Sequence, residues 1–173
     1  MSIEYNLAFE STLAAAQSTL SPQDFNLAVS RALKKLVDWT AVKVSRHFSA
    51  VANIPVRTIK DRVYKHFAVN SQSASLWIGL SRIQAYFLGR VRKNRRGVNV
   101  RGHQFDGAFL ATMKTGHTRV WQRSSDQSLP IEYVYKSITT DADIEAYLAS
   151  ISREVEQRFA VLIQQQLTFL SGA

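Results

Sequence analysis

The stretch GHQFDGAFLATMKTGHTRVWQRSSDQSLPIEYVY, Gly102 to Tyr135, decides the fold. Runs rich in aromatic and β-branched residues alternate in it with turns built on glycine or proline, which predicts short antiparallel strands. TRVWQR and IEYVY are the clearest of these strands. The apolar run AFLATM predicts either a strand or a single helical turn, because six apolar residues do not distinguish the two periods.

The segment before this stretch has the same character. From Tyr64 onward the pattern changes to a period of two, and SLWIGL (75–80) and IQAYFL (83–88) predict further strands. The basic run from Gly89 to Gly97 predicts the turn or loop between two strands. We therefore expect an antiparallel β-sheet with a basic hairpin over residues 64–136.

A long helix is predicted before the sheet. Ser21-Pro22-Gln23-Asp24 combines a capping serine, a proline at the first helical position and an acid at the third, which is typical of a helix start. Apolar residues then recur in steps of three and four up to about Ala52. Asn53-Ile54-Pro55 breaks the helix, because a residue before proline is disfavoured in helical conformation. A second, short helix is expected from Pro55 to about Val63.

A second long helix is predicted after the sheet. Thr140-Asp141-Ala142-Asp143 forms another capping signature, and an apolar stripe runs from Ile144 to Leu170. The chain as a whole predicts one α+β domain over residues 1–173. Its parts are an N-terminal arm or short helix (1–20), a basic helical part (21–63), the sheet (64–136) and the C-terminal helix (140–170).

The positive charge is concentrated in the middle of the chain. The net charge is +9, and residues 31–101 hold 16 Lys and Arg against two acids, a net charge of +14. The segments before and after it carry −3 and −2. Such a segment favours a polyanionic partner, although a solvated basic surface explains the charge equally well.

No motif for catalysis is present. The chain has no cysteine, no Gly-rich phosphate loop, no nucleophile elbow and no zinc-binding set. His103 and Asp106 are three residues apart and suggest a metal-dependent nuclease, but two polar residues in a turn is the interpretation that we favour, since no other carboxylates cluster nearby. No run approaches the roughly 20 apolar residues of a membrane span. We expect no enzyme, no cofactor, no bound metal and no membrane contact.

The order of several short motifs resembles the bacteriophage minor tail protein Z family, the tail-completion proteins of long-tailed phages. The basic helical part contributes Arg31-Ala32-Leu33-Lys34-Lys35, Arg46, Ile54-Pro55, Ile59 and Arg62. The later motifs are Gly107-Ala108-Phe109-Leu110, Lys114-Thr115-Gly116, Val120-Trp121-Gln122-Arg123 and Leu129-Pro130-Ile131. The resemblance covers about residues 28–165.

The resemblance implies a structural protein of the virion that is made in the host cytoplasm and acts in assembly. Such proteins form a ring, expected to be hexameric, at the head-proximal end or neck of the tail, around the path of the DNA. The implied partners are copies of the same chain, the tail terminator or tube protein, the head–tail connector proteins and the end of the genomic DNA.

The basic hairpin is the predicted contact surface. Its side chains are expected to face DNA phosphates or an acidic neighbouring ring, and the residues are Arg90, Arg92, Lys93, Arg95, Arg96 and Arg101. An alternative function is a free-standing basic protein that binds nucleic acid, with Trp77, Tyr86 and Phe87 as a stacking platform. Core packing is the commoner use of aromatic residues in strands, which speaks against that platform.

Overall fold

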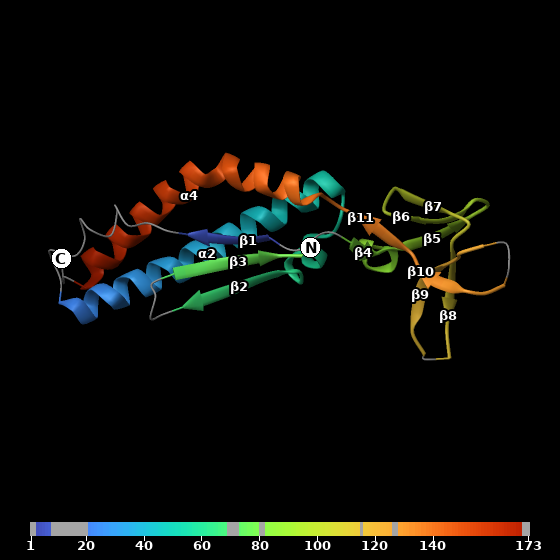
Figure 1. Ribbon diagram of the computed structural model, residues 1–173, viewed down its shortest axis with the longest axis horizontal. Coiled ribbons are helices and arrows are strands. Elements are labelled where there is room, and N and C mark those ends of the chain that lie inside the picture. The colour runs from blue at the N-terminus through green and yellow to red at the C-terminus, as the bar shows by residue number, and fades with distance from the viewer. Residues whose placement is uncertain are drawn as a thin grey trace. The chain divides into compact units, whose positions relative to one another are not determined.

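The computed structural model describes residues 3–7, 21–68, 73–79, 82–114, 116–125 and 128–170. In chain order the elements are β1 (Ile3–Leu7), α2 (Pro22–Ala52), α3 (Val56–Lys60), β2 (Val63–Ala68), β3 (Ser73–Ile78), β4 (Arg82–Gln84), the 3-10 helix η2 (Ala85–Leu88), β5 (Val91–Asn94), β6 (Gly97–Val100), β7 (His103–Asp106), β8 (Phe109–Thr112), β9 (Thr118–Arg123), β10 (Ile131–Tyr133), β11 (Tyr135–Ser137) and α4 (Asp141–Leu170) (Figure 1). This order confirms the predicted α+β class, with long helices on either side of antiparallel strands.

The chain forms two compact units. Unit 1 comprises residues 1–45, 62–79 and 141–173, and unit 2 comprises residues 46–61 and 80–140. Unit 2 carries 14 Lys and Arg against four Asp and Glu, a net charge of +10, whereas unit 1 carries eight against nine, a net charge of −1. The excess positive charge therefore belongs to unit 2. The single domain expected from the sequence stays a prediction.

The two long helices begin and end where their sequence signals lie. At the start of α2, the backbone N–H of Asp24 donates to Ser21 Oγ over 3.2 Å, and that hydroxyl donates to the Asp24 carboxylate over 2.6 Å. The first of these bonds satisfies a backbone donor that an uncapped helix leaves unpaired. The helix ends at Ala52, followed by Asn53 with a φ of 52°. Both predicted bounds of α2 are thus confirmed.

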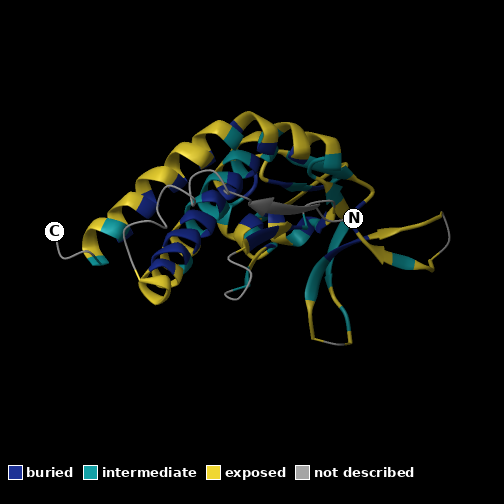
Figure 2. Ribbon diagram, turned by 60° about the vertical axis from the view of Figure 1, so that its left-hand side comes forward, coloured by how far each residue is buried: buried dark blue, intermediate teal, exposed yellow. Residues whose placement is uncertain are grey.

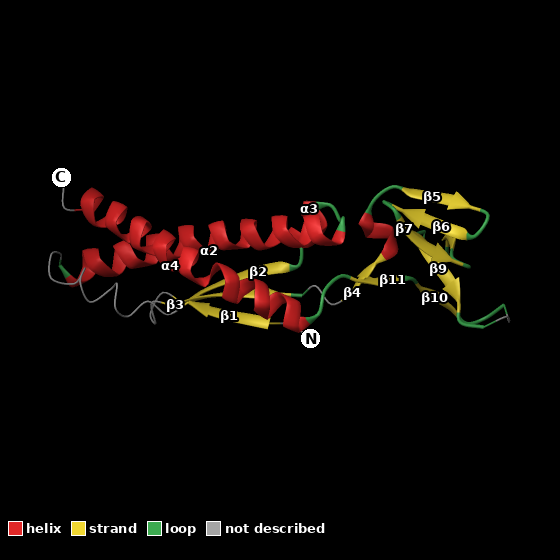
Figure 3. Cartoon of the chain, turned by 90° about the horizontal axis from the view of Figure 1, so that it is seen from above, coloured by secondary structure: helices red, strands yellow, loops and turns green. Residues whose placement is uncertain are grey.

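Helix α4 lies against α2 and runs in the opposite direction (Figure 3). Lys43 of α2 forms an ion pair with Glu154 of α4, and Arg31 lies with its guanidinium carbon 6.0 Å from the ring centre of Phe169. The stripe is buried in the structure, as the sequence predicted, and its buried apolar members are Ile144, Leu148, Ile151, Val155, Phe159, Leu162 and Ile163. Removal of these side chains from water stabilises the helix pair.

The sheet of unit 1 has the strand order β1-β3-β2 and is antiparallel (Figure 1). Ala74, Leu76 and Ile78 alternate on the buried face of its central strand. Residues 3–7 form a strand here, where the sequence left a short helix or a loosely packed arm open. Pairing with β3, about seventy residues later, selects the extended form. The rest of that predicted arm, residues 8–20, lies outside the described residues.

Three small sheets make up the β-structure of unit 2, with the strand orders β10-β9-β8, β11-β4 and β5-β6-β7. The predicted antiparallel β-structure is thus divided into several small sheets, because glycine and proline turns separate the strands into short pairs. The predicted strand over residues 83–88 ends at Gln84 and continues as η2. Ala85 and Leu88 are both buried, and their spacing of three places them on one side of a 3-10 turn. AFLATM forms the strand β8, not a helical turn.

Burial predicts which aromatic residue of α4 holds unit 1 together. Phe159 is fully buried and Phe169, ten residues later on the same helix, is 71% exposed. We expect Phe159→Ala to lower the free energy of unfolding by about 3–5 kcal/mol, through lost packing and a cavity. Phe169→Ala should cost at most about 1 kcal/mol. Urea denaturation followed by circular dichroism measures both, and equal losses would contradict this packing.

Candidate functional site

The six basic residues predicted as a contact surface are all exposed and all belong to unit 2. Two of them lie in β5, two in the turn between β5 and β6, and one beyond each end of the β5–β6 pair. Arg92 and Lys93 are the two in β5, and Arg95 and Arg96 are the two in the turn. Arg90 precedes β5 and Arg101 follows β6. The basic run thus supplies a strand as well as the turn that the sequence predicted.

The strand register sorts the side chains of this sheet onto two faces. Val91 pairs with Val100, and Val98 pairs with Phe105 of β7. Val98 and Val100 are fully buried, so this face packs into unit 2. Because side chains alternate along a strand, Arg92 and Asn99, which pair with each other, lie on the opposite face. That face also carries Asn94, Gln104 and Asp106, and it is polar throughout.

Arg96 is paired within this polar face. Its guanidinium donates a hydrogen bond to the Asp106 carboxylate, and the Gln104 amide donates to the other carboxylate oxygen over 3.0 Å. The Arg96 hydrogen bond, followed by that from Gln104, holds the pKa of Asp106 below its ordinary value. Of the six predicted residues, Arg96 is therefore already partly satisfied by an acid of its own chain.

The turn between β5 and β6 depends on Asn94 and Gly97. Asn94 Oδ1 accepts backbone hydrogen bonds from Arg96 (3.0 Å) and Gly97 (2.9 Å). Gly97 has a φ of 147°, and a Cβ there would lie 2.3 Å from the Phe105 carbonyl oxygen and 2.9 Å from the Gly107 nitrogen. Only glycine permits this approach of backbone to backbone.

Three of the six basic residues, all arginines, lie around one hollow. It has a volume of about 420 Å³ and is lined by Gly89, Arg90, Arg92, Asn99, Arg101 and Gly102. The side chains of Lys93, Arg95 and Arg96 do not line it. The structure thus divides the predicted contact surface into two parts. Arg90, Arg92 and Arg101 form the part that we call the arginine hollow, together with Asn99 and the two glycines.

Asn53 fixes one wall of the arginine hollow. Its Nδ2 donates to the Arg101 carbonyl over 2.9 Å, and its Oδ1 accepts from Arg101 Nε over 3.1 Å. Nearby, His103 Nε2 lies 3.0 Å from the Ala52 carbonyl oxygen, as a donor would. The end of α2 therefore holds the β6–β7 turn. Sequence reasoning missed Asn53 and Asn99. Asn53 lies 48 positions before Arg101 in the sequence, and it was interpreted only as part of the signal that ends the helix.

The predicted family-motif residues form turns and strand pairs of unit 2. Gly107 (φ 70°) donates its N–H to the Arg96 carbonyl over 2.8 Å, and Ala108 is buried. Phe109 pairs with Trp121, and Ile131 pairs with Arg123. The remaining three lie in connecting segments: Lys114, Gly116 and Pro130. Their positions indicate that these residues shape hairpins; Thr115, between Lys114 and Gly116, lies outside the described residues.

The suspected metal pair is separated in the structure. His103 and Asp106 lie in β7 at positions of opposite parity, so their side chains are on opposite faces. No group of three or more metal-binding side chains is found in the described part of the chain. This removes the geometric basis for the nuclease interpretation.

Three aromatic side chains and one arginine contact each other in succession in another part of unit 2. Trp121 stacks on Tyr133 with ring centres 4.4 Å apart, Tyr133 meets Tyr135 edge-on, and Arg82 lies 4.6 Å from the centre of the Tyr135 ring. Tyr133 and Tyr135 are both about 40% exposed. Half-exposed tyrosine and arginine are frequent at protein–protein interfaces. Figure 2 shows that much of the β-structure of unit 2 is intermediate or exposed.

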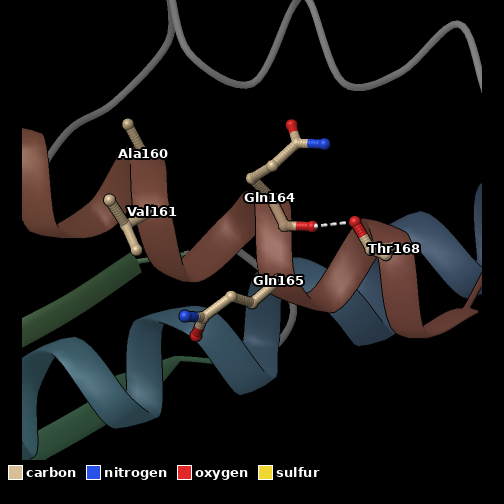
Figure 4. Close-up of a pocket in the computed structure, with 5 residues that line it drawn as sticks. All are labelled: Ala160, Val161, Gln164, Gln165 and Thr168. Carbon is tan, nitrogen blue, oxygen red and sulfur yellow. Dashed lines mark hydrogen bonds between the residues drawn. The ribbon is translucent and has the colours of Figure 1, made fainter.

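A second hollow, of about 660 Å³, lies along α4 (Figure 4). It is lined by Ala160, Val161, Gln164, Gln165 and Thr168. The Thr168 hydroxyl donates to the Gln164 carbonyl within the helix over 3.0 Å. None of these five described side chains is ionisable.

The comparison with known families agrees with the sequence resemblance. The family described as prophage minor tail protein Z (GPZ) matches residues 16–170. Because this match covers most of the chain, the chain belongs to that family. No curated protein and no solved structure matches the chain. Membership assigns the chain a structural, non-enzymatic role in a phage tail, in which it assembles with other tail proteins. None of the described helices has the length and hydropathy needed to cross a bilayer.

The glycine geometry of the basic hairpin is testable by substitution. We expect Gly97→Ala to destabilise unit 2 by about 3 kcal/mol or more, because the new Cβ meets backbone atoms and the positive φ is strained. Gly116→Ala is the matched control: it also has a positive φ (77°), but nothing lies within 4 Å of its Cβ position. Its cost should be about 1–2 kcal/mol. Denaturant unfolding distinguishes the two, and equal costs would show that the close approach is absent.

The Arg96–Asp106 pair predicts a pH effect. Because the folded pKa of Asp106 is lowered, the pair stabilises the turn above the ordinary carboxyl pKa and loses this effect as the pH falls through the lowered value. Arg96→Gln should raise the pKa of Asp106 towards the ordinary value of about 3.9. Arg95→Gln, a neighbouring charge without this hydrogen bond, should change it less. A titration of the carboxyl ¹³C shift measures both, and no difference between the variants would contradict the pairing.

Proposed function

We propose that this chain completes the head-proximal end of a phage tail by forming a ring, with six copies, at the head–tail junction around the path of the DNA. Membership of the minor tail protein Z family supports a tail role. The observation that carries the finer proposal is the uneven charge: unit 2 has a net charge of +10 and unit 1 of −1. A channel through which DNA passes favours such a basic part over a neutral one.

A ring subunit needs two different surfaces that meet in a closed, head-to-tail contact. The exposed aromatic and arginine residues Tyr133, Tyr135 and Arg82 supply one surface of suitable composition. The acids of α4 supply charges opposite to the basic hairpin, and opposed charges orient subunits more than they tighten them. The proposed partners beyond the ring are the tail terminator or tube protein and the head–tail connector proteins.

The proposed role of the exposed cations is to face the DNA end or an acidic neighbouring ring. One copy contributes few contacts, but six copies held around a channel contribute them together, so weak phosphate contacts become strong collectively. The positions named are Arg90, Arg92, Lys93, Arg95, Arg96 and Arg101.

Free nucleic-acid binding is the second candidate. One observation favours it: Phe87 is 44% exposed and Arg119 lies about 5 Å from the Tyr86 and Phe87 ring centres. The third member of the suggested platform, Trp77, belongs to unit 1 and is paired with Tyr64 across the β2–β3 sheet. A gel-shift assay across salt concentrations distinguishes the functions, because a free binder retards DNA as a monomer, whereas an isolated ring subunit binds DNA too weakly to retard it.

The proposal predicts the composition of purified particles. Quantitative mass spectrometry of tails from an induced producing strain should find about six copies of the chain per tail. Deletion of its gene should yield particles with poor infectivity, and the wild-type gene supplied in trans should restore it. Replacing the six cations by glutamine should leave the chain in the tail and displace the DNA end.

Two outcomes would contradict the proposal. Absence of the chain from purified tails would remove the structural role. Infectious particles with normally placed DNA ends, made with the six-residue variant, would remove the role of the cations. Lys34→Gln and Lys35→Gln on the exposed side of α2 serve as a charge control outside the hairpin.

A further inference from the structure

We infer that the arginine hollow is a preformed site for a phosphodiester group of a nucleic-acid backbone, and that Asn53 positions one of its arginines. The inference rests on the proposed function and deepens it, because it selects three of the six exposed cations and names their ligand. The remaining three then act as general surface charge.

The composition of the hollow favours an anion. Three of its six lining residues are arginines, and no Asp or Glu lines it. Three guanidinium groups around one space repel each other unless an anion lies between them. Arginine presents several N–H donors in a planar fork that matches phosphate oxygens, which lysine does not. Asn99 adds an amide: its Oδ1 accepts from the Gly102 N–H over 3.2 Å, so its amide oxygen is engaged by the backbone.

Backbone geometry brings the arginines to the hollow. Arg92 and Asn99 are directly opposite in the β5–β6 pair, so both project from the same polar face. Arg90 precedes that strand, beside Gly89, whose φ of 147° redirects the chain. A Cβ at Gly89 would lie 3.6 Å from Arg101 Cβ, which shows how closely the two sides of the hollow approach. The positions are fixed by strand pairing and turns and do not need the ligand.

Asn53 orients Arg101 without cancelling its charge. Arg101 has a φ of 51°, and Asn53 binds both its carbonyl oxygen and its Nε. One of the five guanidinium donors is thereby used, and the partner is a neutral amide, so the full positive charge remains for a ligand. Arg96 has the opposite arrangement, since its hydrogen-bond acceptor is the Asp106 carboxylate. This difference separates a binding arginine from a structural one.

The size of the hollow favours a nucleic-acid backbone over a free ion. A volume of about 420 Å³ falls in the range of roughly 300–1,000 Å³ that sites for small molecules occupy. It therefore has room for a phosphate together with part of its sugar. Acidic side chains of a neighbouring protein are the other possible source of an anion, and the experiment separates the two.

The test compares two variants with the same loss of charge. The hollow variant carries Arg90→Gln, Arg92→Gln and Arg101→Gln, and the turn variant carries Lys93→Gln, Arg95→Gln and Arg96→Gln. Binding of the isolated full chain to a fluorescent 12-base-pair DNA duplex is followed by anisotropy at several salt concentrations. NMR titration with inorganic phosphate, which detects millimolar affinity, follows the Asn99 side-chain amide. Circular dichroism checks that each variant is folded.

We expect the hollow variant to bind the duplex at least about tenfold more weakly. The slope of log affinity against log salt concentration should become less steep by up to about three. The turn variant should change affinity less than about threefold. Arg92→Gln alone, at an exposed strand position, should lower affinity in the same direction even if the triple variant fails to fold. Asn53→Ala should weaken binding although all three arginines remain. Arg101→Lys, which keeps the charge, should also bind the duplex more weakly than the wild-type chain.

Three results would overturn the inference. The first is an equal loss in both triple variants, which would show an effect of net charge only. The second is no duplex binding and no shift of Asn99 with phosphate at millimolar concentration. The third is that poly-glutamate displaces the duplex more effectively than an oligonucleotide of equal charge does, which would indicate an acidic protein partner. All three leave the copy number in tails untouched, so failure of the site and failure of the ring proposal are distinguishable.

Discussion

The end of α2 at Asn53 is the constraint on which the functional part of unit 2 depends. The chain leaves the helix there with a positive φ, and the Asn53 side chain forms hydrogen bonds with both the carbonyl oxygen and the guanidinium of Arg101. The adjacent Ala52 carbonyl oxygen lies at hydrogen-bond distance from His103 Nε2. Two adjacent residues of a helix end thus hold a turn about fifty positions later in the sequence. Without that link, the β6–β7 turn and the arginine on it would be held only by local strand pairing and by the hydrogen bond from the Gly102 N–H to Asn99 Oδ1.

Charge and packing are divided between the two units. The buried stripe of α4, the matching stripe of α2 and the sheet β1-β3-β2 give unit 1 its apolar core, and its net charge is close to zero. Unit 2 is made of short strand pairs, and it carries the excess of Lys and Arg. Outside the arginine hollow, Lys93, Arg95 and Arg96 are exposed to solvent, where salt screens their mutual repulsion. The division supports a protein that contributes contacts and charge to an assembly.

The sequence was most informative where a local signal determines the structure. The bounds of α2 and α4 follow from Ser21, the Asn53-Ile54-Pro55 break and the acids at Asp141 and Asp143, all within a few residues of the helix ends. It was least informative where a distant partner decides. The strand at residues 3–7 exists through β3, and η2 replaces a strand because Ala85 and Leu88 are buried together. The six cations were recognisable from their spacing, but their division into a hollow and a turn requires the register of β5, β6 and β7, together with the acid at Asp106.

A cryo-electron microscopy reconstruction of the head-proximal end of the intact tail tests the central claim most directly. The account predicts a closed ring of identical copies of this chain, with Arg90, Arg92 and Arg101 of each copy turned towards the density of the DNA. A ring built without this chain would contradict it. So would copies of the chain that line the outer surface of the particle with these arginines facing solvent.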